Sequence, residues 1–472
     1  MNELTISLNV KSKVPLYEQI YRYIRQDIRE GRIRSGEKLP STRALSKYLE
    51  VSRSTVELAY EQLLSEGYLE AEPCRGYFVA EIEGLYQLQS QKVQTDPQKE
   101  KPNRKYLYDF TPNGVDLNSF PYNAWRKLSR ECLQDDRAEL FRLGDPQGEW
   151  GLRNAICNYL HQARGVNCTP EQIIVGAGND YLLMLLTTVI GHQHTVALEN
   201  PTYVQAYRLF EQLSYNVCTV DMDTKGMKVG QLEASAADIA FVMPSHQYPL
   251  GIVMPIKRRV ELLKWAESSD VNGKERYIIE DDYDSEFRYK GKPVPALQGY
   301  DCNDRVVYIG TFSKSIAPAI RMSYLVLPKS LLENYQKNSR FLSSTVSRVD
   351  QLILQKFIEE GYYERHLNKM RALYKNRHDI LLSSLKKMGN MFQISGEHAG
   401  VHLLLEFQDK RSEEELIMRA EKKGIRVYGL SQYCVKDHEK ERDRATILLG
   451  YANMNEDAIP KAVALLEEAW KV

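Results

Sequence analysis

The sequence has no excess of charge of either sign and no long apolar run. Its 63 lysines and arginines are matched by 63 aspartates and glutamates, so no overall field would draw the chain to nucleic acid or to a membrane. The segment Met1-Asn2-Glu3-Leu4 lacks the basic and apolar regions of a signal peptide. The best apolar run, residues 182–190, is interrupted by threonines and is too short to span a bilayer. These absences predict a cytoplasmic protein with no membrane partner.

Cysteine is scarce, and its spacing follows no known framework. The seven cysteines are odd in number, are scattered along the chain and include no Cys-x-x-Cys pair. Disulfide scaffolds need paired cysteines, and zinc sites commonly use closely spaced ones. We therefore expect free or buried thiols in a reducing compartment, and neither a disulfide framework nor a zinc site.

Composition divides the 472 residues into three regions. Residues 1–80 have the pattern of short helices followed by a hairpin. Residues 81–105 are polar and include two prolines, which predicts a linker. In residues 106–472, short apolar strands alternate with helices, which is typical of an α/β domain with a mainly parallel sheet. Within this domain we expect a large part at about 140–330 and a small C-terminal α+β part at about 345–472.

The N-terminal region has the pattern of an α+β winged helix-turn-helix. One helix starts at Pro15, a second is capped by Ser41, and a third follows Ser52 and ends at Gly67. Polar and guanidinium groups at the helix starts and at the tip of the hairpin could contact the phosphates and base edges of double-stranded DNA. These residues are Arg43, Ser52, Arg53, Ser54, Thr55 and Arg75. Because the charge of this region is almost balanced, a small helical interaction domain is the alternative.

Lys314 is the most informative residue of the C-terminal region. A strand-like run at residues 306–309 leads into Thr311-Phe312-Ser313-Lys314, and Arg321 follows seven residues later. Upstream, another apolar strand ends in Glu280-Asp281-Asp282-Tyr283. An amine, a carboxylate, hydroxyls and an arginine at strand ends are what a protein needs to hold pyridoxal phosphate. The amine condenses with the aldehyde, the carboxylate pairs with the pyridinium nitrogen, and the other groups bind phosphate.

The N-terminal motifs resemble the GntR-type winged helix. The resemblance covers residues 15–79 and rests on LPSTRAL at 39–45, VSRSTV at 51–56 and RGYFV at 75–79. It implies that the residues in contact with the operator are Arg43, Ser52, Arg53, Thr55, Arg75 and Gly76.

Residues 108–472 resemble the fold-type I aminotransferases. The shared motifs include DPQG at 145–148, GAGND at 176–180, ENPTY at 199–203 and PSHQYPLG at 244–251. The joined architecture resembles the MocR subgroup of GntR regulators, in which a winged helix is fused to an aminotransferase-like domain. The resemblance also implies a homodimer, because fold-type I active sites usually form between two subunits.

The resemblance implies a role for each residue around pyridoxal phosphate. Lys314 bonds the aldehyde, Asp281 pairs with the ring nitrogen, and Tyr203 stacks on the ring. Gln247 and Tyr283 lie near the ring oxygen. The phosphate is bound by the helix start at Gly178 and Asn179 and by Thr311, Ser313 and Arg321. Two points stay open: Asp282 could exchange roles with Asp281, and His246 could pack beneath the site.

One departure from the transaminase pattern concerns the substrate carboxylate. Transaminases hold this group with an arginine near the C-terminus, but the corresponding run at residues 446–452 has none. Arg442 and Arg444 lie just upstream, and Gln205 offers only an amide. No anchor for an effector carboxylate is therefore identified.

These observations favour a transcription regulator that holds pyridoxal phosphate as an internal aldimine on Lys314. An amino acid or another amine would be sensed by formation of an external aldimine, which changes how two winged helices meet DNA. One alternative is an active pyridoxal-phosphate-dependent aminotransferase with an appended DNA-binding domain. Another is a regulator that senses pyridoxal phosphate itself, which would use the same residues.

Overall fold

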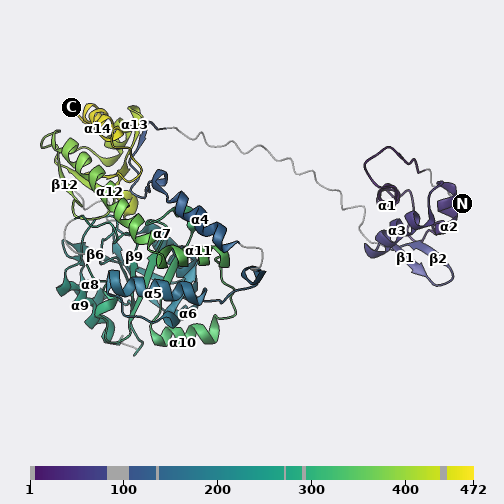
Figure 1. The fold of residues 1–472 in the computed structure, drawn as a ribbon, viewed down its shortest axis with the longest axis horizontal. Coiled ribbons are helices and arrows are strands. Elements are labelled where there is room, and N and C mark those ends of the chain that lie inside the picture. Colours follow the sequence, from purple (N-terminus) through teal and green to yellow (C-terminus); the bar gives the residue numbers. More distant parts are fainter. Residues whose placement is uncertain are drawn as a thin grey trace. The chain divides into compact units, whose positions relative to one another are not determined.

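The computed structural model describes residues 6–81, 106–133, 138–269, 273–289, 294–435 and 444–471. The chain divides into two compact units, Met1–Asn103 and Arg104–Val472, each shown in Figure 1. The boundary falls inside the predicted linker 81–105, which lies outside the described residues apart from Glu81. None of the described helices is long and apolar enough to cross a bilayer.

The N-terminal unit consists of three helices and a hairpin. Its elements are α1 (Leu16–Arg29), α2 (Thr42–Tyr48), α3 (Arg53–Ser65), β1 (Leu69–Glu72) and β2 (Gly76–Val79), the two strands pairing antiparallel. The side chains of Ser41 and Ser52 accept hydrogen bonds from backbone N–H groups at the starts of α2 and α3, which satisfies donors that a helix start leaves free. Buried Ile24, Val56 and Leu63 belong to the core that the helices share. The predicted helix-turn-helix with a hairpin wing is confirmed.

A mainly parallel sheet forms the large part of the C-terminal unit. Its strand order is β4-β11-β10-β9-β8-β5-β6-β7. The strands are β4 (Ile173–Gly176), β5 (Thr195–Asn200), β6 (Asn216–Asp223), β7 (Gly226–Met227), β8 (Ile239–Val242), β9 (Tyr277–Asp282), β10 (Val306–Thr311) and β11 (Ser323–Val326). Strands β11 and β7 run antiparallel to their neighbours. The predicted mainly parallel α/β fold is confirmed, and its carboxyl edge gathers the ends of β4, β5, β8, β9 and β10.

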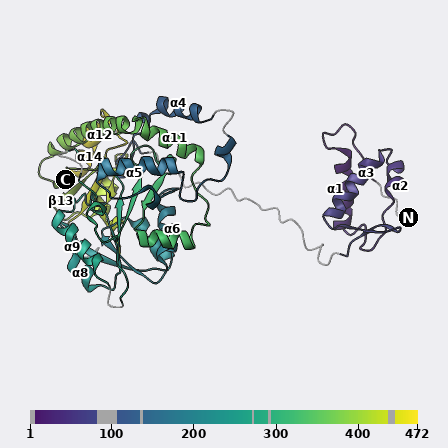
Figure 2. The same cartoon turned by 60° about the horizontal axis from the view of Figure 1, so that its bottom comes forward.

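Helices cover both faces of this sheet, as the two views in Figures 1 and 2 show. One face packs against α5 (Trp150–Arg164), α8 (Val229–Ala234), α9 (Ile256–Glu267) and α11 (Arg348–Glu359). The other packs against α6 (Asn179–Ile190), α7 (Val204–Gln212) and α10 (Lys329–Asn338). Along β9, Ile278 belongs to the α9 face and Ile279 to the α6 face. Because side chains alternate along a strand, Asp281 and Asp282 must face opposite sides of the sheet.

The small part packs helices against an antiparallel sheet. Its order is β12-β13-β16-β15, from β12 (Phe392–Ser395), β13 (His402–Phe407), β15 (Tyr428–Gly429) and β16 (Thr446–Gly450). The helices are α12 (Tyr362–Lys386), α13 (Glu413–Lys422) and α14 (Ala458–Trp470). The apolar run at residues 425–428 is divided between two strands. The chain changes partner at Val427, since β14 (Ile425–Arg426) pairs with β3 (Tyr108–Asp109) and β15 pairs with β16.

The segment after β3 runs from the small part to the carboxyl edge of the large sheet. Its backbone passes so close to β16 that a Cβ atom on Gly450 would lie 1.9 Å from the Thr111 carbonyl oxygen. The Gly450 N–H donates to the Phe110 carbonyl over 2.8 Å. A glycine is therefore required at this point of β16, and the close approach fixes the position of Asn113 two residues further on. Helix α4 (Tyr122–Cys132) follows.

Candidate functional site

The residues predicted to contact DNA lie where the N-terminal unit exposes its helix starts. Arg43 is exposed in the first turn of α2, and Arg53 is exposed at the first position of α3. Arg53 Nε forms an exposed ion pair with Glu57 over 2.7 Å. Ser52, which is also a predicted DNA contact, caps α3. Its hydroxyl accepts from the Thr55 backbone N–H and lies 2.7 Å from the Thr55 hydroxyl. Ser52 and Thr55 thus define the start of the helix that a helix-turn-helix places in the major groove.

The tip of the hairpin carries the remaining predicted contact residues. Arg75 is exposed, pairs with Glu72, and places its guanidinium over the Phe78 ring at 5.4 Å from the ring centre. Gly76 directly follows Arg75 and starts β2, opposite Glu72. The structure thus places a cation and a small residue at the tip of the wing.

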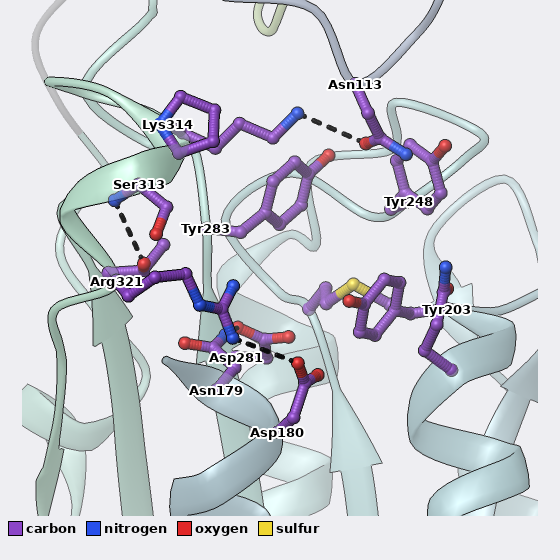
Figure 3. A pocket seen from close by; sticks show the side chains of 14 residues that line it. Asn113, Asn179, Asp180, Tyr203, Tyr248, Asp281, Tyr283, Ser313, Lys314 and Arg321 are labelled. Atoms are coloured by element: carbon purple, nitrogen blue, oxygen red, sulfur yellow. Dashed lines mark hydrogen bonds and ion pairs between the residues drawn. The ribbon is translucent and has the colours of Figure 1, made fainter. Parts of the chain in front are cut away.

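A cavity of about 210 Å³ opens at the carboxyl edge of the large sheet (Figure 3). Each wall comes from a segment next to a strand end, which is where open α/β sheets bind ligands. The lining residues are Asn113, Asn179, Asp180, Tyr203, Gln205, Met243, Tyr248, Asp281, Tyr283, Thr311, Ser313, Lys314, Pro318 and Arg321. Of the predicted cofactor residues, only Gly178 and Gln247 are not among those lining residues.

Lys314 follows β10 and points its amine into this cavity (Figure 3). Its Nζ donates to Asn113 Oδ1 over 3.1 Å. Burial lowers the pKa of the Lys314 amine to about 8, and nearby Asp284 only partly opposes this shift. The neutral, nucleophilic amine is therefore well populated near neutral pH. Asn113 was missed from the sequence because it belongs to no motif and reaches the cavity only through the β3–β14 pairing.

Asp281 projects from the end of β9 into the cavity on the α6 face. Asn179 Nδ2 donates to its Oδ1 over 3.3 Å, and the Asn179 Oδ1 atom is buried without a hydrogen-bond partner. Burial, with repulsion from Asp282 and Asp284, raises the pKa of the Asp281 carboxyl to about 7. A cationic group beside Asp281 would stabilise its ionised form.

Asp282 lies on the opposite face and is already paired. Its Oδ2 atom accepts from Arg164 Nε over 2.9 Å and from the Tyr308 hydroxyl over 2.6 Å. Arg164 also donates to the Ser245 hydroxyl over 2.7 Å, so it ties the end of α5 to the loop after β8. The side chains of Arg164 and Asp282 are 3% and 2% exposed. The alternation along β9 therefore places Asp281 in the cavity and gives Asp282 a structural partner.

A cradle for an anion lies between Gly178 and Arg321, at the start of α6. Gly178 has a φ of 91°, and a Cβ atom there would lie 2.4 Å from an Arg321 guanidinium nitrogen. Only glycine permits this approach. Arg321 donates to Asp180 Oδ2 over 3.1 Å. The Thr311 hydroxyl oxygen accepts from the Ser313 backbone N–H over 3.1 Å. A helix start, a guanidinium and hydroxyls together form an anion site.

Aromatic groups form one side of the cavity, and an imidazole lies behind one of them. Tyr203 and Tyr283 both line it. The Tyr283 hydroxyl lies 2.9 Å from His246 Nδ1, which lies 2.9 Å from an Asp284 carboxylate oxygen. His246 is buried and does not line the cavity, consistent with a position beneath the site.

Gln247, expected near the ring oxygen, has its side-chain hydrogen bonds with neighbouring backbone groups. Its amide nitrogen donates to the carbonyls of Pro201 and Tyr248, and its oxygen accepts from the Leu250 backbone N–H. The side chain is almost completely buried and is not among the cavity-lining residues. Its hydrogen bonds instead hold the 247–250 loop against the segment after β5.

The cavity offers no second guanidinium for a carboxylate among its described lining residues. Arg444 donates to Glu406 over 2.9 Å as an exposed pair, and Arg442 lies outside the described residues. Gln205 and Asn113 are exposed at the cavity and supply amides. The cavity therefore offers an amine and a cradle for one anion. For a second anion, such as a carboxylate, its described lining residues offer amide donors and no further guanidinium.

These residues fit pyridoxal phosphate. Among the described residues no cation pairs with the Asp281 carboxylate, and a protonated ring nitrogen would supply one, while Lys314 would supply the amine for the aldehyde. The cradle of Gly178 and Arg321 fits a phosphate. Tyr203, the residue expected to stack on the ring, lines the same cavity (Figure 3).

Comparisons with known proteins cover both units. Residues 112–466 match the family of aminotransferases of class I and II, and residues 16–79 match the bacterial regulatory proteins of the gntR family. The chain is 39% identical over 471 residues to the uncharacterized HTH-type transcriptional regulator YdeL of Bacillus subtilis (strain 168), with 100% of both chains covered. It is 30% identical over 468 residues to the HTH-type pyridoxine biosynthesis transcriptional regulator PdxR of Corynebacterium glutamicum, covering 99% of this chain and 98% of that protein.

A solved structure matches the fold of the C-terminal unit. The multiple substrate aminotransferase of Thermococcus profundus superposes with a TM-score of 0.68 at 24% sequence identity, covering 78% of this chain and 92% of that chain. This likeness establishes the architecture of the C-terminal unit.

We predict that Arg164→Gln destabilises the C-terminal unit by about 3–5 kcal/mol, because it leaves the Asp282 carboxylate buried without its partner. Urea unfolding followed by tryptophan fluorescence measures the change. Arg444→Gln is the matched control, since Arg444 and Glu406 are 51% and 43% exposed. Loss of such a surface pair should cost less than about 1 kcal/mol. Equal unfolding midpoints for the two variants would contradict the structural role of Arg164.

Proposed function

The chain belongs to the MocR-type GntR transcription regulators, and on that basis we propose that pyridoxal phosphate held by Lys314 controls its binding to operator DNA. An amino acid or another amine is the proposed effector. The observation that carries the proposal is the meeting of three groups in one cavity, namely the Lys314 amine, the Asp281 carboxylate and the Arg321 guanidinium. These groups match the aldehyde, ring nitrogen and phosphate of a single cofactor.

Each residue has a defined task in this proposal. Pyridoxal phosphate, when bound, supplies an aldehyde that bonds amines and a ring that withdraws electrons from them. Lys314 holds the aldehyde carbon, and Asp281 keeps the ring nitrogen protonated. Arg321 and the start of α6 bind the phosphate. Asn113 Oδ1, which lies 3.1 Å from the Lys314 Nζ, would hold this amine whenever it is not bonded to the aldehyde.

The proposal favours sensing over sustained transamination. A full transamination cycle binds two acids in turn, and a carboxylate arginine serves both of them. The described cavity supplies amides from Asn113 and Gln205 in place of a second arginine. A sensor needs only one binding event and a difference in effector affinity between two states, typically about 1–3 kcal/mol.

Pyridoxal phosphate itself is the second candidate signal. PdxR, a relative that covers almost the whole chain, is named as a regulator of pyridoxine biosynthesis. In that case the signal would be the cofactor's arrival at Lys314. Measuring operator affinity with pyridoxal phosphate alone and then with added amino acids separates the two candidates. An affinity change at the first addition favours the cofactor, and a change only at the second favours an amine.

We further propose that the protein is a homodimer. Phe141, Leu143 and Phe341 are large apolar residues that are 76%, 89% and 82% exposed. All three line one surface hollow of the C-terminal unit. Exposed apolar groups gathered in one patch mark an interaction surface. A two-fold dimer would also present two winged helices, which suits a site made of two half-sites.

We predict that Lys314→Ala loses the visible absorption of protein-bound pyridoxal phosphate, since no amine remains to bond the aldehyde. Far-ultraviolet circular dichroism should be unchanged. The control is Lys337→Ala, which removes an exposed lysine from α10 and should leave the spectrum unaltered. An unchanged visible spectrum in the Lys314 variant would refute the assignment.

We predict that Arg53→Ala weakens operator binding by about 1–3 kcal/mol without changing the cofactor spectrum, because Arg53 lies at the start of the recognition helix. Fluorescence anisotropy with labelled operator at several salt concentrations measures this loss. Arg22→Ala serves as the control, since Arg22 lies in the middle of α1 and pairs with Glu18 on that helix. Equal affinity of both variants would remove α3 from the DNA interface.

We predict that Leu143→Glu raises the dimer dissociation constant at least about tenfold, because a charge buried without a partner costs more than the 1.4 kcal/mol that this factor represents. Sedimentation equilibrium measures the constant. Met418→Glu, on the half-exposed surface of α13, is the matched control and should remain dimeric. A parent protein that sediments as a monomer would defeat the dimer proposal.

A further inference from the structure

Two thiols and an imidazole converge at the end of α5, away from the cofactor cavity. Cys157 and His161 lie one turn apart on α5, and Cys168 lies on the segment that leads from α5 to β4. The two sulfur atoms are 3.9 Å apart, and Cys157 Sγ is 3.7 Å from His161 Nε2. All three donor atoms lie within 4.8 Å of one another. Both cysteines are buried, whereas His161 is exposed.

These distances match the edges of a tetrahedral zinc site. With Zn–S bonds of about 2.3 Å and Zn–N bonds of about 2.05 Å, a tetrahedron has S–S edges of about 3.8 Å and S–N edges of about 3.6 Å. The observed 3.9 Å and 3.7 Å match these two edges. The third, from Cys168 Sγ to His161 Nε2, is at most 4.8 Å, so a turn of the imidazole toward Cys168 Sγ would complete the three-donor face. We propose that Cys157, His161 and Cys168 bind a zinc ion, with water from the exposed side as the fourth ligand.

The donor set selects zinc by its chemistry. Two thiolates and one imidazole form a soft set that suits Zn²⁺ and disfavours Mg²⁺ and Ca²⁺, which take oxygen ligands. In the metal-free protein, the Cys157 thiol and the imidazole both contact the Cys168 carbonyl, at 3.3 Å and 2.7 Å. On binding, two S–H bonds break, two Zn–S bonds form, and both protons pass to solvent. The contact with the carbonyl oxygen places the imidazole proton on Nε2, so binding through Nε2 requires that proton to leave to solvent while Nδ1 takes one up.

The ion would join the end of α5 to the segment that enters β4. Both lie next to elements whose ends form the cofactor cavity. Cys157 and His161 hold the last turns of α5, and Arg164 in its final turn donates to Asp282 and Ser245. Cys168 holds the segment that enters β4, whose far end leads to Gly178. The zinc ion would thus be structural. The proposal does not depend on the proposed function, because none of its ligands lines the cofactor cavity.

The full-length protein can be tested with Cd²⁺, which replaces zinc at thiolate sites and shows cadmium–thiolate absorption in the ultraviolet, away from the visible bands of pyridoxal phosphate. We expect the parent protein to bind a single Cd²⁺ with this absorption. His161→Gln should weaken cadmium binding at least about tenfold, since even losses outside the ligand shell weaken metal binding 10–100-fold. His161 is exposed, so this variant tests the site without disturbing the core. Cys157→Ser should lose the band.

Cys302→Ser is the matched control, because Cys302 is an exposed thiol outside the cluster and should leave the band intact. Zinc should also raise the melting temperature of the parent protein but not that of His161→Gln. Three results would overturn the proposal. They are the absence of the band in the parent protein, a band that persists in both ligand variants, and a Cys157–Cys168 disulfide with no bound metal.

Discussion

The alternation of side chains along β9 is the constraint on which the site depends. It sends Asp281 toward α6 and the cavity, and Asp282 toward α5 and Arg164. The two neighbouring carboxylates therefore differ in their surroundings. Asp281 faces the cavity, where it could bind a cation, and Asp282 is paired with the buried guanidinium of Arg164. A slip of one residue in the register of β9 would exchange them, since the side-chain period of a strand is two. The parallel pairing of β9 with β8 and β10 prevents that slip across a sheet buried on both faces.

The electrostatics of the cavity describe a site prepared for a ligand that carries both a cation and an anion. Burial favours the neutral forms of Lys314 and Asp281, shifting their pKa values toward about 8 and about 7. Arg321 meanwhile shares its guanidinium with Asp180. A phosphate must compete with Asp180 for that guanidinium, so part of the binding free energy replaces an existing ion pair. Because the Arg321 and Asp180 side chains are 53% and 59% exposed, the cost of breaking this pair would be small.

The strands and helix starts that position the two candidate sites could be predicted from the sequence, because each depends on a local pattern of residues. The strands leading to Lys314 and Asp281 are continuous apolar runs, and the helix starts at Ser41 and Ser52 are capping signals. Gln247 shows what a local pattern does not contain. Its position in the HQYPLG segment says nothing about which carbonyls fold back onto its amide, and those partners decide its role. The place of Asn113 in the cavity and the approach of Cys157 to Cys168 could not be predicted for the same reason, because contacts between separate segments have no local signature.

Among the described residues that line the cavity, Arg321 is the one arginine. Lys314, Asp281 and Arg321 line one cavity and together offer an amine, a carboxylate and a guanidinium. The missing group is the one that a transaminase uses to hold the carboxylates of successive acids. Amides at Asn113 and Gln205 bind more weakly than a guanidinium, because hydrogen bonds to charged donors are roughly twice as strong as neutral ones. Weak, reversible engagement of one amine suits a sensor whose output is DNA occupancy, whereas it would limit an enzyme that must bind both substrates in turn.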